Sequence, residues 1–130
     1  MNFFIKKNSS LPVLIFPITQ KMMEKLNLTE EMFENVVVTF SMVNADTDKF
    51  KIANSAGDFS INSNPVLSHG QEKYSLTYNF TTKQTGDVGN YIGEFVVDFL
   101  DENNAGKLKL PIDDVINIVI ANSITKTSFI

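Results

Sequence analysis

The clearest pattern along the chain is an alternation of apolar and polar residues at every second position. In segment 35–43 every second residue is a large apolar one: Val36, Val38, Phe40 and Met42. Segment Lys73–Thr81 alternates in the same way. This is the period of a β-strand with one buried face. Further strands are predicted at 3–6, 11–18, 49–53, 58–61, 91–100, 107–110 and 115–124.

Helical spacing is confined to one region near the start of the chain. Gln20–Leu26 and Thr29–Phe33 place methionines and a phenylalanine in an apolar stripe. Glu30 and Glu31 suit the N-terminus of a helix. Strands and long helices do not alternate afterwards, so a parallel α/β sheet is not expected.

Short strands separated by turn signals every 8–12 residues or so are typical of a sandwich or barrel. We predict one domain over residues 1–130, an all-β, immunoglobulin-like antiparallel β-sandwich with one or two short helical turns near residues 20–34. The chain has no cysteine and no tryptophan, so it lacks the disulfide and the buried Trp of antibody domains. In the predicted strand 49–53, Phe50 and Ile52 share a face. Gly93, inside another strand, predicts a bulge or a close approach of the backbone.

Composition narrows the function classes. The chain has 130 residues, a formal net charge of -4 and 43% hydrophobic residues, as expected for one globular domain. The acidic balance argues against nucleic acids and anionic membrane surfaces as partners. Neither a signal peptide nor a segment long enough to span a bilayer is readable. We therefore expect synthesis and folding in a cytoplasm.

Catalytic chemistry is not indicated. The absence of cysteine excludes thiol catalysis and zinc–thiolate sites, and His69 is the only histidine. No Gly-x-Ser-x-Gly motif accompanies it, so we interpret His69 as a plain loop residue and the protein as not an enzyme.

Metal and cofactor binding are not indicated either. Asn44, Asp46 and Asp48 resemble the opening of a calcium loop, but Lys49 and Ser55 stand where that loop needs Gly and Glu. A solvated turn is the better interpretation. We interpret the glycines of segment 86–89 as a connection between strands, since no helix follows to bind a phosphate. The clustered acids are interpreted as a solvated rim: Asp98, Asp101, Glu102, Asp113 and Asp114.

The C-terminal half carries a recognisable layout. Tyr74–Phe80 is followed by Thr85–Phe99, which contains Gly-Asn-Tyr-Ile-Gly-Glu-Phe, and then by Gly106–Ile112 and Ile116–Ile120. This resembles the "G-x-Y-x-x-E-F … G … x-x-P … I-x-I" layout of tailed-bacteriophage virion domains, of the kind found at the N-terminus of baseplate upper proteins.

The N-terminal half is similar to the same domains. Phe4–Pro12 looks like their opening strand and turn, and Val36–Met42 looks like their "V-x-F-x-M" strand. The shared features are turn glycines, an edge proline and alternating strands, so the resemblance brings no catalytic residues. Baseplate upper proteins continue into a further region, whereas this sequence covers one domain. The position in a particle, at the head, collar or tail, therefore stays open.

The resemblance implies a structural component of a phage particle, made in the bacterial host cytoplasm and located in the virion. Its partners would be other virion proteins, with the chain present as a homo-oligomer or in multiple symmetric copies and without cofactors. Met22, Met23 and Phe33 are candidates for either the core or a docking surface. The segments 11–18 and 115–124 are candidate free strand edges. The candidate interface residues are Phe3, Phe4, Pro12, Leu14, Phe16, Phe129 and Ile130.

A carbohydrate- or host-surface-binding β module is the alternative. Such a module needs an exposed aromatic platform, for which Tyr74, Tyr78 and Tyr91 are the candidates. All three lie on alternating strands, so packing in the core explains them equally well.

Overall fold

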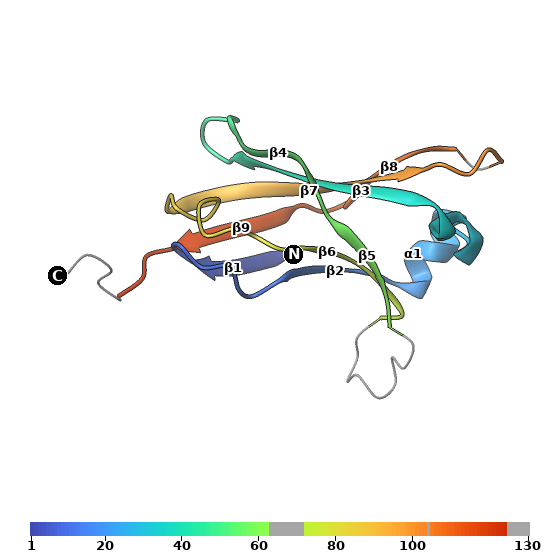
Figure 1. The fold of residues 1–130 in the computed structure, drawn as a ribbon, viewed down its shortest axis with the longest axis horizontal. Coiled ribbons are helices and arrows are strands. Elements are labelled where there is room, and N and C mark those ends of the chain that lie inside the picture. Colours follow the sequence, from blue (N-terminus) through green and yellow to red (C-terminus); the bar gives the residue numbers. More distant parts are fainter. Residues whose placement is uncertain (63–71, 104, 125–130) are drawn as a thin grey trace.

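A computed structural model describes residues 1–62, 72–103 and 105–124 of the chain. Two short helices, α1 and the 3-10 helix η1, follow the second strand (Figure 1). Every predicted strand is present, but β2 begins at Leu14 rather than Leu11 and β9 ends at Ala121 rather than Ile124. The elements are β1 (Asn2–Lys6), β2 (Leu14–Ile18), α1 (Gln20–Lys25), η1 (Glu30–Glu34), β3 (Val36–Asn44), β4 (Phe50–Ala56), β5 (Asp58–Ile61), β6 (Tyr74–Tyr78), β7 (Gly89–Phe99), β8 (Gly106–Leu110) and β9 (Ile116–Ala121).

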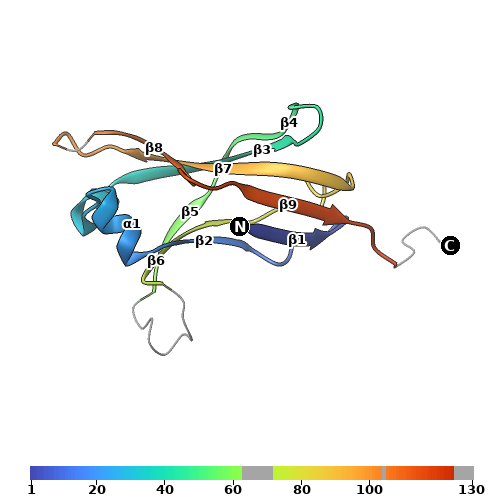
Figure 2. The same ribbon diagram turned by 180° about the vertical axis from the view of Figure 1, so that it is seen from behind.

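The strands form two sheets that pack face to face. The large sheet has the order β1-β9-β7-β3-β4, with β8 also paired to β7, and the small sheet has the order β2-β6-β5. Strands β8 and β9 follow one another along the same edge of β7, pairing with residues 95–99 and 89–93 respectively. Figure 2 shows the two layers from the opposite side. The predicted all-β sandwich is confirmed.

The strand order is that of an immunoglobulin-like sandwich. In those domains strands B, E and D lie in one sheet and strands C, F and G in the other. Here β2, β6 and β5 match the first set, while β3, β7 and β9 match the second. The hydroxyl of Tyr91, near the start of β7, donates a hydrogen bond to the carbonyl oxygen of Asp87 at 2.9 Å. That contact corresponds to the tyrosine corner found near the start of strand F.

One strand pair corrects the prediction of a purely antiparallel sandwich. Strand β1 runs parallel to β9, with Phe3 opposite Ile118 and Ile5 opposite Ile120. The first and last strands are joined through the whole chain rather than by a hairpin, so no tight turn imposes an antiparallel arrangement.

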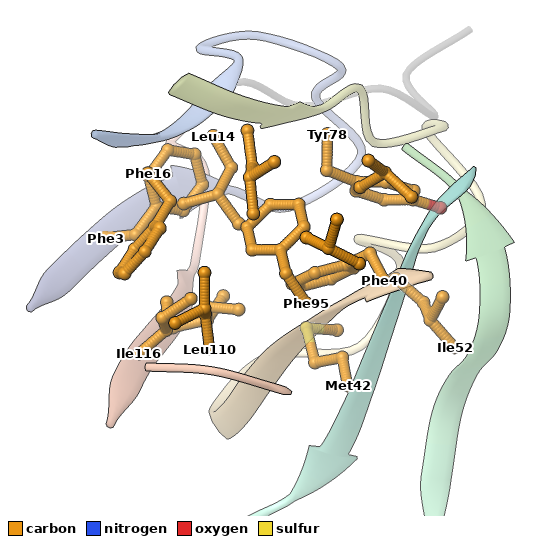
Figure 3. Close-up of a cluster of buried hydrophobic side chains, with 14 of the residues drawn as sticks. Phe3, Leu14, Phe16, Phe40, Met42, Ile52, Tyr78, Phe95, Leu110 and Ile116 are labelled. Atoms are coloured by element: carbon orange, nitrogen blue, oxygen red, sulfur yellow. The ribbon is translucent and has the colours of Figure 1, made fainter. Parts of the chain in front are cut away.

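The core lies between the two sheets and is built from alternate residues of the strands, those that point inward (Figure 3). Phe40 and Phe95 are fully buried, with ring centroids 5.0 Å apart. The alternating residues Tyr74, Leu76 and Tyr78 are also buried, as the period-2 pattern predicts.

Gly93 is required by this core. A Cβ atom there would lie 2.8 Å from Cε1 of Phe40 and 2.9 Å from Cδ1 of Ile118. The prediction of a close approach is confirmed, and it involves the Phe40 ring rather than a bulge, because Gly93 stays in register with Met42. In antibody domains the second cysteine lies two residues after the corner tyrosine, which is the place of Gly93 here.

The helical segment closes one end of the sandwich. Thr19 caps α1, since its Oγ1 accepts a hydrogen bond from the backbone N–H of Met22 at 3.1 Å. In η1, the ring of Phe33 stacks on Phe59 at 4.6 Å and meets the edge of Phe99 at 5.3 Å. Met23 and Phe33 are therefore core residues.

Candidate functional site

The outer face of the large sheet carries an apolar stripe where alternation leads us to expect polar residues. Five of its six strands contribute an apolar side chain to a row that points away from the core. Phe4 and Phe50 are 64% and 67% exposed and Ile92 is 36% exposed, while Val43 and Val119 are half-buried. We call this set the outer stripe: Phe50 (β4), Val43 (β3), Ile92 (β7), Val119 (β9) and Phe4 (β1).

Strand register makes the outer stripe continuous. Phe50 lies opposite Val43, and Val43 lies opposite Ile92. Val119 lies opposite Phe4 on β1 and opposite Asn90 on β7, one step along the sheet from Ile92. Side chains on directly opposite residues are close enough to touch, and diagonal neighbours are within reach of large side chains. The five residues therefore form one band across the sheet.

A bulge in β4 places Phe50 in this band and corrects the prediction that Phe50 and Ile52 share a face. Val43 pairs with Phe50 while its neighbour Met42 pairs with Ile52, so Lys51 is an extra residue in the ladder. Ile52 is buried and Phe50 faces solvent. An inserted residue reverses the side-chain alternation, which the sequence pattern alone did not reveal.

The outer stripe has polar and charged neighbours on this face. Asn90 and Asn117 lie opposite Val119 and Ile92, and the Asn117 amide donates to the Asn2 side chain at 3.2 Å. Two residues beyond Ile92 on the same outward side of β7 is Glu94. Beyond Phe50, a shallow hollow of ≈ 450 Å³ opens toward the charged residues of the same face, Glu94, Asp98, Lys107 and Lys109. The stripe is therefore an apolar row bordered by polar and charged residues, as in many interaction surfaces.

The predicted interface residues divide between this surface and the core. Phe4 belongs to the outer stripe, and Pro12 is exposed in the β1–β2 connection. Phe3, Leu14 and Phe16 are buried, because they take the inward parity of β1 and β2, so their assignment to an exposed interface is corrected. Phe129 and Ile130 lie outside the described residues.

Of the two segments predicted to be free strand edges, only one is an edge. Strand β9 lies between β1 and β7, so segment 115–124 presents no free edge and that prediction is wrong. Strand β2 is an edge of the small sheet, as expected. Pro17 lies within β2 and has no backbone N–H to offer an added strand, a common protection of edges.

A second surface feature is a groove of ≈ 390 Å³ between α1 and segment 111–114. Phe16 and Leu110 line its base, and Met22 and Leu26 line the helix side. Nζ of Lys25 reaches Oδ2 of Asp113 at 3.0 Å, so an ion pair links the two walls.

The remaining polar candidates take structural roles. The side-chain oxygen of Asn44 accepts from the backbone N–H groups of Asp46 and Thr47 at 2.9 and 3.1 Å, which is the predicted turn. The 86–89 segment connects β6 to β7, as predicted. Among residues 1–62, 72–103 and 105–124, no group of three acidic or histidine side chains gathers in a geometry suited to a metal ion. His69 lies outside these ranges.

The tyrosines proposed as a glycan platform are not exposed. Tyr74, Tyr78 and Tyr91 are 6%, 2% and 4% exposed, and the Tyr78 hydroxyl is hydrogen-bonded to Ser55 at 2.9 Å. The exposed aromatic rings of the described structure are instead Phe4 and Phe50, at opposite ends of the outer stripe.

Contacts at the surface shift the pKa values of Asp87, Asp114 and Lys73. The hydrogen bond and charge of Lys51 lower the pKa of Asp87, and a hydrogen bond from the amino group of Met1 lowers that of Asp114. The pKa of Lys73 is raised by its contacts with Tyr74 and Glu30. All three groups lie on the surface, each with an identified structural partner, and none lies in the outer stripe.

Comparison with known protein families, curated proteins and solved structures found no match to this chain. Within the described ranges, neither helix has the length and apolar character needed to cross a bilayer.

Proposed function

We propose that this protein is a structural component of a bacteriophage particle that acts through protein–protein contacts. It is made in the cytoplasm of the bacterial host and is assembled into the virion in multiple copies. The resemblance of its strand and turn layout to phage virion domains motivates this proposal. The observation that carries it is the outer stripe, an uncharged apolar band across five strands.

The physical reason is the cost of leaving such a band in water. Burial of apolar surface stabilises an association by roughly 25 cal/mol per Å². Isolated apolar residues are common on protein surfaces, but contiguous patches mark contact sites. Phe4 and Phe50 are 64% and 67% exposed. Of the stripe residues, these two would therefore bury the most apolar surface against a partner.

The carbohydrate-binding alternative has less support. The three tyrosines on which it depended are core residues. Phe4 and Phe50 are separated by three intervening strands, so they do not form one platform for a single sugar ring.

The test is sedimentation of the native source material, followed by mass spectrometry of the virus-sized fraction. We expect the chain in that fraction at a fixed ratio to the major capsid protein. Its presence only in the light soluble fraction would contradict the proposal, and a glycan array would then test the alternative.

A further inference from the structure

We propose that β1 pairs edge to edge with β1 of a second copy of this chain, antiparallel about a two-fold axis at Phe4, so that the two large sheets join into one. This inference deepens the proposed function and rests on it, because it names a contact through which copies of the protein associate. Three observations support it: the free backbone groups of β1, the hydrogen bonds of the polar side chains beside Phe4, and the obstruction of the other strand edges.

The hydrogen bonds between β1 and β9 show which backbone groups of β1 are free. At one end, the carbonyl oxygen of Met1 accepts from the N–H of Asn117 at 2.8 Å. At the other end, the N–H of Lys7 donates to the carbonyl oxygen of Ala121 at 2.8 Å. In a parallel pair, alternate residues direct their backbone groups to the neighbouring strand, so the odd-numbered residues of β1 bond to β9. Within the described ranges, β1 pairs with β9 alone. The residues whose N–H and C=O groups point to the open edge are therefore Asn2, Phe4 and Lys6.

The polar side chains on either side of Phe4 are hydrogen-bonded on the β9 side of the strand. The Asn2 side chain accepts from the Asn117 amide at 3.2 Å. Nζ of Lys6 donates to the carbonyl oxygen of Asn122, just after β9, at 3.2 Å. Edge lysines commonly prevent strands from pairing, but here the lysine is held away from the edge. Phe4, which is 64% exposed, is thus the central side chain of an open edge.

The other edge strands of the two sheets are obstructed. Strand β2 contains Pro17, and β4 has two register shifts against β3 and a φ of 50° at Asn54. Strand β8 carries Lys107 and Lys109, and β5 has only four residues. Prolines, bulges, charges and short length are the features that keep edges from pairing. Among the described edge strands, β1 combines an unbroken register with the absence of proline and of an outward-held charge.

The open edge of β1 is complementary to itself. In an antiparallel pair, every second pair of opposite residues exchanges both N–H···O bonds. With Phe4 opposite Phe4 of the second copy, Asn2 lies opposite Lys6, so each outward N–H reaches a carbonyl oxygen. The Lys6 carbonyl oxygen accepts from the N–H of Ser9 at 3.1 Å and has a second lone pair for the partner strand. Lysine does not oppose lysine, and the two Phe4 rings form a cross-strand aromatic pair, which stabilises sheets.

Amide hydrogen exchange tests this pairing at the backbone. In dilute protein the N–H of Phe4 should exchange fast, whereas the N–H of Ile5 should exchange slowly because it bonds to β9. When the concentration is raised until the dimer forms, exchange at Phe4 should slow at least about tenfold and exchange at Ile5 should stay unchanged. A dimer in which the Phe4 amide still exchanges fast would overturn the proposal.

Cross-linking gives a second test, because the chain contains no cysteine. Phe4→Cys and Phe50→Cys replace side chains that are 64% and 67% exposed, so the fold should tolerate both. The two copies of position 4 would lie about 5 Å apart, and a short bis-maleimide should link them. Position 50 is four strands from β1, so its two copies would lie about 40 Å apart and should not link.

A matched pair of charge variants gives the third test. Phe4→Lys places two ammonium groups at the axis and should raise the dimer dissociation constant at least about tenfold. Phe50→Lys makes the same change at the opposite edge of the sheet and should leave dimerisation unchanged. Circular dichroism should show both variants folded.

The proposal is overturned if the wild-type chain stays monomeric at about 100 μM, if Phe50→Cys links as readily as Phe4→Cys, or if the two lysine variants weaken the dimer equally. These outcomes are separate from the test of the proposed function. A dimer that is missing from the particle contradicts only the phage proposal, and a particle protein that is monomeric in solution contradicts only the edge pairing.

Discussion

The ring of Phe40 packs directly against the backbone of Gly93 in the core. The ring of Phe40 fills the volume that a side chain at position 93 would take, with atoms 2.8 Å from the place of a Cβ. In an antibody domain a disulfide and a tryptophan occupy this region. A chain without cysteine or tryptophan can fill the region with a phenylalanine ring, provided that the facing residue is glycine.

We predict that Gly93→Ala destabilises the protein by about 1–3 kcal/mol, the usual cost of overpacking a core. The fully buried Phe40 ring has no room to move aside. Urea unfolding measures the effect. The double variant Gly93→Ala, Phe40→Leu should recover part of the loss relative to the sum of the single variants. Strict additivity would show that the clash with Phe40 is not the cause.

Asp87 gives a prediction about pH at the same scale. Lys51 holds the pKa of Asp87 below its usual range, mainly through a hydrogen bond and also through charge. Because the folded-state pKa is lowered, the pair stabilises the fold above the unfolded-state pKa of Asp87. That contribution is lost as the pH falls through the folded-state pKa.

Replacing Lys51 by Met should therefore raise the pKa of Asp87 toward its ordinary value, which a carboxyl-detected NMR titration measures. The stability difference between Lys51→Met and the wild type should shrink in acid. An Asp87 pKa that is the same in both proteins would contradict the pairing. Lys49→Met, in the same turn region, is the control and should leave Asp87 unchanged.

At the scale of elements, alternation and turn signals together located the strands, because most strands bury one face and the alternation of apolar residues is visible in the sequence. The period-2 pattern of Tyr74, Leu76 and Tyr78 is a clear example, since all three are buried. Pairing was harder to predict. The sequence predicts a free edge at segment 115–124, because nothing local indicates that β1, more than a hundred residues earlier, lies beside β9.

The outer stripe was missed for a related reason. Its members come from five strands, and only the register brings them together. Phe4 was a candidate because of its apolar character, but Phe50 was assigned to the opposite face because the bulge at Lys51 leaves no signal in the pattern. Interface residues chosen by hydrophobicity alone therefore included Phe3, Leu14 and Phe16, which belong to the core.

The short helix α1 gives a prediction at the element scale. Its first turn depends on Thr19, whose hydroxyl oxygen accepts from the N–H of Met22 at 3.1 Å. Thr19→Ala should cost about 0.5–2 kcal/mol, the usual effect of losing an N-cap. Thr19→Ser keeps the hydroxyl and should stay close to the wild type. Thermal unfolding compares the two, and an equal loss in both variants would argue against capping.

At the scale of the whole molecule, the two sheets present different outer faces. The small sheet turns Ile15 and Pro17 of β2 outward beside Ser75 and Thr77 of β6. The large sheet turns out a row of apolar residues that crosses five of its strands. A row of this length is what we expect of a subunit that uses this face for assembly.

Sedimentation of the native source material tests this claim most directly. We predict that the chain is recovered in the virus-sized fraction at a fixed ratio to the major capsid protein. Recovery of the chain only in the light soluble fraction would contradict the assignment of the outer stripe to assembly.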